Sequence, residues 1–125
     1  MVSTDISQLA AECNTWRANL RNYRDEFSQF TNRLQEFASR QSDKNVLQEV
    51  ERYHNQFQIQ LINIHDLKHN IKEHERMTDW ELRTGQGISD GSWVKHEELY
   101  EKYQHLDHML QELKDKFSQF IKSPN

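Results

Sequence analysis

Apolar residues recur along the first third of the chain with a spacing that alternates between three and four residues. This alternation is typical of a helix whose apolar side chains form one seam, as at the a and d positions of a heptad repeat. It predicts a helix over about residues 5–40, whose first amides are capped by Thr4 or Asp5. The seam contains Ile6, Leu9, Cys13, Trp16, Leu20, Tyr23, Phe27, Phe30, Leu34 and Phe37.

Two further segments carry the same spacing. The second predicts a helix over about residues 43–83, in which polar Gln60 and His74 occupy seam positions. The third predicts a helix over about residues 92–122, which begins with Ser92 as the cap and has His96 first in its seam. A buried glutamine can fix the register between helices, at a cost in stability. The apolar seam positions are Val46, Val50, Tyr53, Phe57, Ile64, Leu67 and Ile71, then Leu99, Tyr103, Leu106, Leu110, Leu113, Phe117 and Phe120.

The connections between the segments differ in their turn signals. All three glycines lie within residues 84–91, which predicts a loop there. No glycine or proline separates the first two segments, but the nine residues from Phe37 to Val46 would rotate the seam by about 180° in a continuous helix. A break near residues 41–43, capped by Ser42 or Asp43, lets both seams face one core. The alternative, a long continuous helix that two chains exchange, stays open.

These elements predict an all-α fold in a single domain over residues 1–125. We expect an elongated, antiparallel, up-down-up three-helix bundle with coiled-coil (heptad) packing, because short connections make neighbouring helices antiparallel. In its heptads and in the seam tryptophan of its first helix, Trp16, this arrangement resembles the spectrin repeat. The resemblance implies the architecture and no functional residue.

Composition and charge narrow the possible functions. The mean hydropathy of −1.06 is as low as in many disordered chains, but a strict seam needs only about two apolar residues in seven. The net charge is −4 and no third of the chain is basic, so we expect no nucleic-acid partner. No apolar run approaches about 18 residues and no signal peptide is evident, so we expect no membrane partner and a cytoplasmic location.

The histidines are the main candidates for metal binding. His65 and His69 are spaced i, i+4 on one helix face, which makes half of a possible zinc site that Glu73 or a symmetry-related chain could complete. His105 and His108 lie at a similar height but on the opposite flank. A solvated surface is the simpler interpretation, so no metal and no cofactor are expected. A loop centred near residue 88 would also keep His74 and His96 from direct contact.

No arrangement of residues indicates catalysis. Cys13 is the only cysteine and occupies a seam position, where we expect it to be buried and unreactive. The chain shows no catalytic triad and no glycine-rich phosphate loop, and a narrow bundle offers no obvious cleft. We therefore expect that the protein is not an enzyme.

Several large apolar residues fall away from the seams. On the second helix these are Ile59, Ile62, Met77 and Trp80, and on the third they are Trp93 and Tyr100. Near the loop, Ile88 could fold back and cover the tryptophans. Ile59 and Ile62 are too far from the loop for that, and they favour a contact surface. We expect an interaction module that self-associates, as a possible homodimer, or docks to another helical protein. A spacer with polar, unrecognisable contacts is the alternative.

Overall fold

The computed structural model describes residues 4–122 and contains three helices. They are α1 (Thr4–Ala38), α2 (Lys44–Arg83) and α3 (Asp90–Lys122). The helices pack against one another, and no strand occurs within the described range. The expected all-α three-helix bundle is confirmed. None of the described helices combines the length and apolar character needed to cross a membrane.

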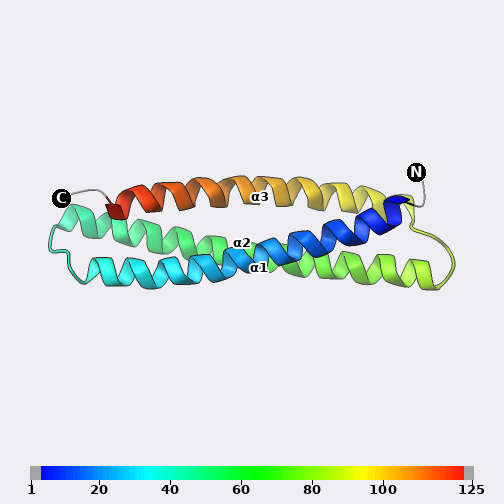
Figure 1. Cartoon of the computed structure of the whole chain (residues 1–125), viewed down its shortest axis with the longest axis horizontal. Helices are drawn as coiled ribbons and strands as arrows, with labels where there is room; N and C mark the ends of the chain where they lie inside the picture. The colour runs from blue at the N-terminus through cyan, green and yellow to red at the C-terminus, as the bar shows by residue number, and fades with distance from the viewer. Residues whose placement is uncertain (1–3, 123–125) are drawn as a thin grey trace.

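The three helices run up, down and up along one elongated body (Figure 1). α1 and α3 are parallel, and the side chains that join them keep a nearly constant separation in sequence. Asn19 contacts Tyr103 and Tyr23 contacts Asp107, both 84 residues apart, while Glu26 pairs with Lys114, 88 residues on. These offsets differ by no more than about one helical turn, so α1 and α3 lie side by side along their shared length.

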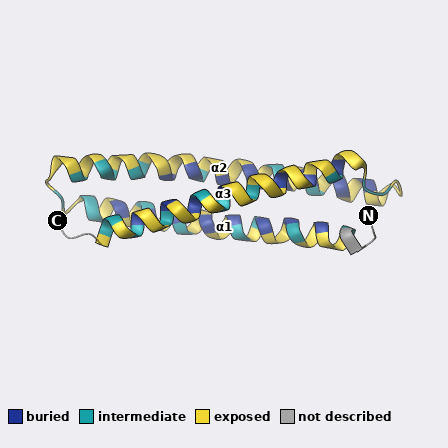
Figure 2. Cartoon of the chain, turned by 90° about the horizontal axis from the view of Figure 1, so that it is seen from above, coloured by how far each residue is buried: buried dark blue, intermediate teal, exposed yellow. Residues whose placement is uncertain are grey.

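The seam residues form a continuous core between the three helices, and the outward surfaces are exposed (Figure 2). Rings from all three helices meet in the half of the core away from the α2–α3 loop: Phe27 and Phe30 from α1, Phe57 from α2 and Phe117 from α3. The centroids of contacting rings lie 5.0–6.2 Å apart in tilted or edge-to-face contacts, the geometry that aromatic pairs prefer. Gln60 is buried at its seam position and accepts a hydrogen bond from Asn63.

The break between α1 and α2 is confirmed, and Asp43 caps α2 by accepting from the amide of Asn45 at 2.8 Å. The cap expected for α3 is wrong. The caps expected for α1, Thr4 or Asp5, lie outside the residues whose side chains the structure describes. α3 begins at Asp90, before Ser92, because the hydroxyl of Ser89 accepts from the Ser92 amide at 3.1 Å and supplies the cap one turn earlier.

α2 ends in a Schellman motif that turns the chain toward α3. The Gln86 amide donates to the carbonyl of Glu81 and the Gly85 amide donates to that of Leu82. Gly85 adopts a positive φ of 78°, which the motif requires and which residues with a Cβ rarely adopt. The loop then brings Ile88 back onto the core, where Trp93 also packs. Trp80 stays exposed, so Ile88 covers this end only in part.

Candidate functional site

The outer face of α2 carries the apolar residues that the sequence places away from the core. Ile59 and Ile62 are 55% and 60% exposed, and Met77 and Trp80 are exposed as well. At 100° per residue, all four lie within an arc of about 80° on the helix, together with Asp66, His69 and Glu73. The stripe thus has one apolar pair at each end and polar residues between the pairs. We call these seven residues the α2 outer stripe.

The two predicted contact residues of α3 differ from each other. Tyr100 is exposed, although its ring stacks on Trp16 with centroids 5.8 Å apart. Trp93 is half-buried and packs against the core, with its ring edge-on to His96. Trp93 is thus mainly part of the bundle's packing at the loop end.

The surface histidines do not assemble into a site. His65, His69, His105 and His108 are all exposed. The His108 ring lies 3.4 Å from a carboxylate oxygen of Glu112, and Glu73, the suggested third ligand, pairs with Arg76 at 2.6 Å. Among the side chains that the structure describes, in residues 6–122, the one group of three that could hold a metal ion is elsewhere, inside the bundle.

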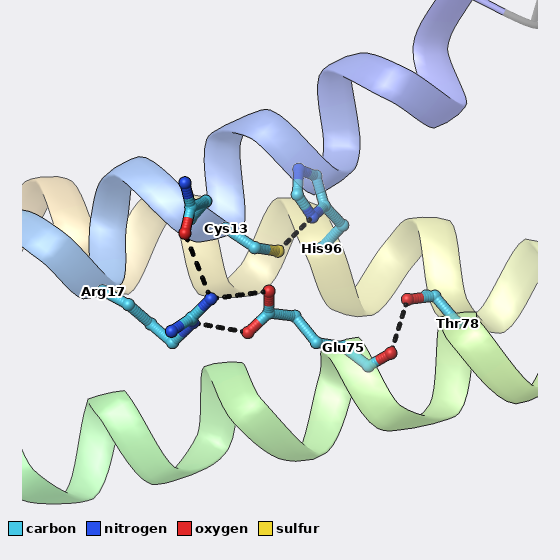
Figure 3. Close-up of polar contacts among 6 residues, drawn as sticks. Cys13, Arg17, Glu75, Thr78 and His96 are labelled. Carbon is cyan, nitrogen blue, oxygen red and sulfur yellow. Dashed lines mark hydrogen bonds and ion pairs between the residues drawn. The ribbon is translucent and has the colours of Figure 1, made fainter.

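That internal group consists of Cys13 from α1, His74 from α2 and His96 from α3, all buried. His74 Nε2 is 3.2 Å from His96 Nδ1, and Cys13 Sγ is 3.8 Å from the same nitrogen. All three potential ligand atoms lie within 4.8 Å of one another. Figure 3 shows Cys13 of α1 and His96 of α3 pointing toward each other. We call these three residues the internal cluster.

The contact between His74 and His96 contradicts the pairing expected from the sequence. That pairing assumed a loop centred near residue 88 and placed the two histidines at different heights. Because α3 begins at Asp90, two residues early, the centre of the loop lies nearer 86–87 and each α3 residue shifts relative to α2. The two histidine rings, whose centroids are 5.3 Å apart, reach across the remaining difference.

Surrounding side chains hold His96 in one orientation. Its Nε2 lies 2.8 Å from a carboxylate oxygen of Glu12, which as an acceptor requires the proton on Nε2. The indole of Trp16 stacks on the ring, with centroids 4.8 Å apart. In the neutral ring, Nδ1 is therefore an unprotonated lone pair that faces Cys13 and His74.

Charged groups surround the internal cluster without entering it. Arg17 of α1 forms a two-pronged ion pair with Glu75 of α2, with Nε and Oε1 2.6 Å apart (Figure 3). Burial, with Glu75 nearby, raises the pKa of the Cys13 thiol to about 12. Burial, with His96 alongside, lowers the pKa of His74 to about 4. Both groups are therefore neutral at pH 7, and the expectation of a buried, unreactive Cys13 fits this environment.

A groove of about 480 Å³ lies between α1 and α2 near the internal cluster. Leu9 and Thr78, one helical turn from Cys13 and His74 respectively, line it together with Glu75. Exposed charged groups such as Lys72 and Arg76 lie around it. The groove thus lies about one helical turn along α1 and α2 from the internal cluster.

The sequence did contain a signal for the internal cluster. Cys13, His74 and His96 all occupy seam positions close to the loop end of their helices. Seam positions at one height along the bundle axis must converge in the core. The sequence pattern lacked only the information that these three positions share one height. Comparison with known proteins adds no relative: no family model, no curated protein and no solved structure matches the chain.

Proposed function

We propose that the chain is a non-catalytic interaction module that associates with a second copy of itself through the α2 outer stripe. The observation that carries this proposal is the exposure of Ile59, Ile62, Met77 and Trp80 on one face of α2. Apart from Leu47 and Leu82 near its two ends, the rest of the exposed surface of α2 is polar, so a cluster of apolar side chains on one face favours a partner.

The spacing of the stripe suits a second copy rather than an unrelated surface. Ile59 and Trp80 are equally far from the midpoint between His69 and Asn70, and so are Ile62 and Met77. A two-fold axis at this midpoint would pair two α2 helices antiparallel, Ile59 against the partner copy's Trp80 position and Ile62 against its Met77 position. Such an isologous contact forms two equivalent apolar patches, about 27 Å apart along the helix, each made by one apolar pair from each copy.

The polar middle of the stripe restricts the register. Shifting one copy by a heptad would place Ile59 against Glu73 in one direction and Trp80 against Asp66 in the other, so this register alone matches apolar with apolar. In that register the acidic residues of the two copies approach each other, with His69 from each copy between them. Four apolar residues per copy give less than the usual 1,200–2,000 Å² interface, so we expect a weak, reversible dimer.

Light scattering coupled to size-exclusion chromatography at several concentrations tests the association. The molar mass should rise with concentration from 15.2 kDa toward twice that value. Ile62→Asp should keep the helical content but hold the mass at the monomer value across the range, because it places a charge in the apolar contact. A mass of 15.2 kDa at every concentration of the unchanged protein would overturn the proposal.

Val94→Asp is the matched control. Val94 is a β-branched residue of α3 with an exposure of 57%, close to the 60% of Ile62, but it lies outside the α2 outer stripe. We expect Val94→Asp to associate like the unchanged chain. Equal weakening by both substitutions would show that charge alone, and not the stripe, controls association.

Disulfide trapping tests the register. In the symmetric pairing, position 62 faces position 77 of the other copy and is about 22 Å along the helix from the other copy's position 62. A mixture of Ile62→Cys and Met77→Cys chains should therefore cross-link faster than either variant alone. Cys13 is buried and should not compete.

A further inference from the structure

From the geometry of the internal cluster we infer that Cys13, His74 and His96 bind one transition-metal ion, of which Zn²⁺ is the reference case. A thiolate and two imidazoles form a donor set that zinc favours. Each helix supplies one ligand, so the ion would join all three helices at the loop end. This function is separate from self-association, because the internal cluster and the α2 outer stripe share no residue.

Two of the three distances between ligand atoms are close to those around a tetrahedral ion. With bonds of about 2.3 Å to sulfur and about 2.0–2.1 Å to nitrogen, neighbouring ligand atoms in such a site lie about 3.3–3.6 Å apart. The separation of the two histidine nitrogens is 3.2 Å and that of Cys13 Sγ from His96 Nδ1 is 3.8 Å. Cys13 Sγ and His74 Nε2 lie within 4.8 Å of each other and would move closer on binding. Three protein ligands occupy three corners of the tetrahedron and leave the fourth for water.

Hydrogen bonds within the internal cluster do not match its possible donors with its acceptors. The lone pair of His96 Nδ1 is approached by two possible donors, the Cys13 thiol and the N–H of His74 Nε2. An aromatic nitrogen has one in-plane lone pair, so it cannot accept fully from both. A metal ion in the space between the three atoms would use the lone pair of each, once the thiol proton has left to solvent.

Glu12 completes a pattern common in metal proteins. Ligating histidines usually donate their other ring N–H to a carboxylate or carbonyl, which fixes the tautomer and strengthens the ligand. The 2.8 Å contact from His96 Nε2 to Glu12 has this geometry and leaves Nδ1 for the ion. Glu12 is thus a positioning residue for His96.

The charges around the internal cluster suit a divalent cation. Glu12 contacts His96, and the ion pair of Glu75 with Arg17 lies beside Cys13. These three groups carry one net negative charge. A divalent ion bound to a thiolate contributes one net positive charge, so the filled site would be neutral, which limits the cost of burying the ion.

Cobalt(II) provides the decisive probe, because it occupies zinc sites and reports its ligands in absorption. We expect the chelator-treated full chain to bind one Co²⁺ with a thiolate-to-cobalt charge-transfer band and intense tetrahedral d–d bands, and excess Zn²⁺ to abolish both. Cys13 is the chain's only cysteine, so the charge-transfer band on the unchanged protein can come only from this residue. Its absence would overturn the inference without any variant.

Variants then separate the ligands from the surface histidines. Cys13→Ala should remove the charge-transfer band and the one-to-one zinc binding measured by calorimetry. A His65→Ala, His69→Ala double variant should keep both, because these side chains are exposed. Zinc binding that survives Cys13→Ala but disappears in the double variant would assign the metal to the surface and contradict the inference.

Glu12→Gln tests the positioning role. The amide cannot accept from His96 as strongly as the carboxylate, so zinc affinity should fall by about 10–100-fold while the charge-transfer band is retained at saturating Co²⁺. Unchanged affinity would remove Glu12 from the site. Circular dichroism of each variant, with and without metal, checks that the bundle stays folded.

Discussion

Tyr23 shows how a single polar group can be buried between helices at no loss of hydrogen bonding. Its hydroxyl donates to Asp107 and accepts from the side-chain amide of Gln111 at 2.6 Å, which joins α1 to α3. Burial, together with the hydrogen bond to Asp107, raises the pKa of the phenol well above its usual value near 10. The protonated phenol is therefore the form that stabilises the fold.

This pKa shift predicts an alkaline loss of stability. Above pH 10 the unfolded chain loses the Tyr23 proton while the folded chain keeps it, so the free energy of unfolding should fall as pH rises, by about 1 kcal/mol per pH unit through this group. Tyr23→Phe should cost about 1–2 kcal/mol at pH 8 and progressively less above pH 10. Urea unfolding of both chains between pH 8 and 11 measures this; a constant difference would contradict the assignment.

The internal cluster illustrates what residue patterns alone leave undetermined. Burial of Cys13, His74 and His96 follows from their seam positions, which the spacing of apolar residues reveals. Their contact depends on relative height, and an error of little more than one helical turn was enough to separate the two histidines. Height depends on the path of the loop, and the path depends on a cap at Ser89 that several nearby residues could have supplied.

At the scale of the element, the heptad spacing accounts for most of the fold. It predicts three helices, the break before Asp43 and nearly all of the buried apolar residues, because a seam is a local pattern. The spacing also places Ile59, Ile62 and Trp93 away from the seams. Ile59 and Ile62 are exposed, whereas Trp93 is half-buried. Trp93 lies one turn from His96 at the loop end, where side chains pack over the end of the bundle as well as across it.

The two ends of the α2–α3 loop give a matched pair of glycine substitutions. Gly85 has a positive φ and open space around its missing Cβ, so Gly85→Ala should lower the free energy of unfolding by about 1 kcal/mol through backbone strain alone. Gly91 lies in the first turn of α3 without a positive φ, and its added Cβ would meet only Ser89 Oγ at 3.9 Å.

Gly91→Ala should therefore raise the free energy of unfolding by up to about 1 kcal/mol, since alanine loses less backbone freedom in a helix. Chemical denaturation of the two variants beside the unchanged chain measures both effects. Shifts of the same sign would contradict the role of the Schellman motif.

At the scale of the whole molecule, the bundle is chemically uneven along its length. Phenyl rings from the three helices pack together in one stretch of the core, whereas Cys13, His74 and His96 interrupt the apolar core at the loop end. The phenyl rings carry no polar atom that would require a hydrogen-bond partner or a ligand. The loop end carries the buried polar atoms that a metal ion would satisfy.

Self-association should appear in thermal unfolding of the whole molecule. If the folded chain forms dimers and the unfolded chain does not, Tm must rise with protein concentration by mass action. Over a hundredfold increase in concentration we expect a rise of a few degrees for the unchanged chain and for Val94→Asp, and none for Ile62→Asp. Calorimetry on metal-free samples measures this; a concentration-independent Tm for all three would argue against the dimer.

The parallel alignment of α1 and α3 has a mechanical consequence. α1 begins at the loop end of the bundle and α3 ends at the opposite end (Figure 1). A force that pulls these two ends apart acts along the helices, so it loads the contacts between α1 and α3 in shear and all at once. Tyr23 with Asp107 and Glu26 with Lys114 would have to yield together rather than one after another. Under tension the bundle should therefore resist extension until these contacts break together.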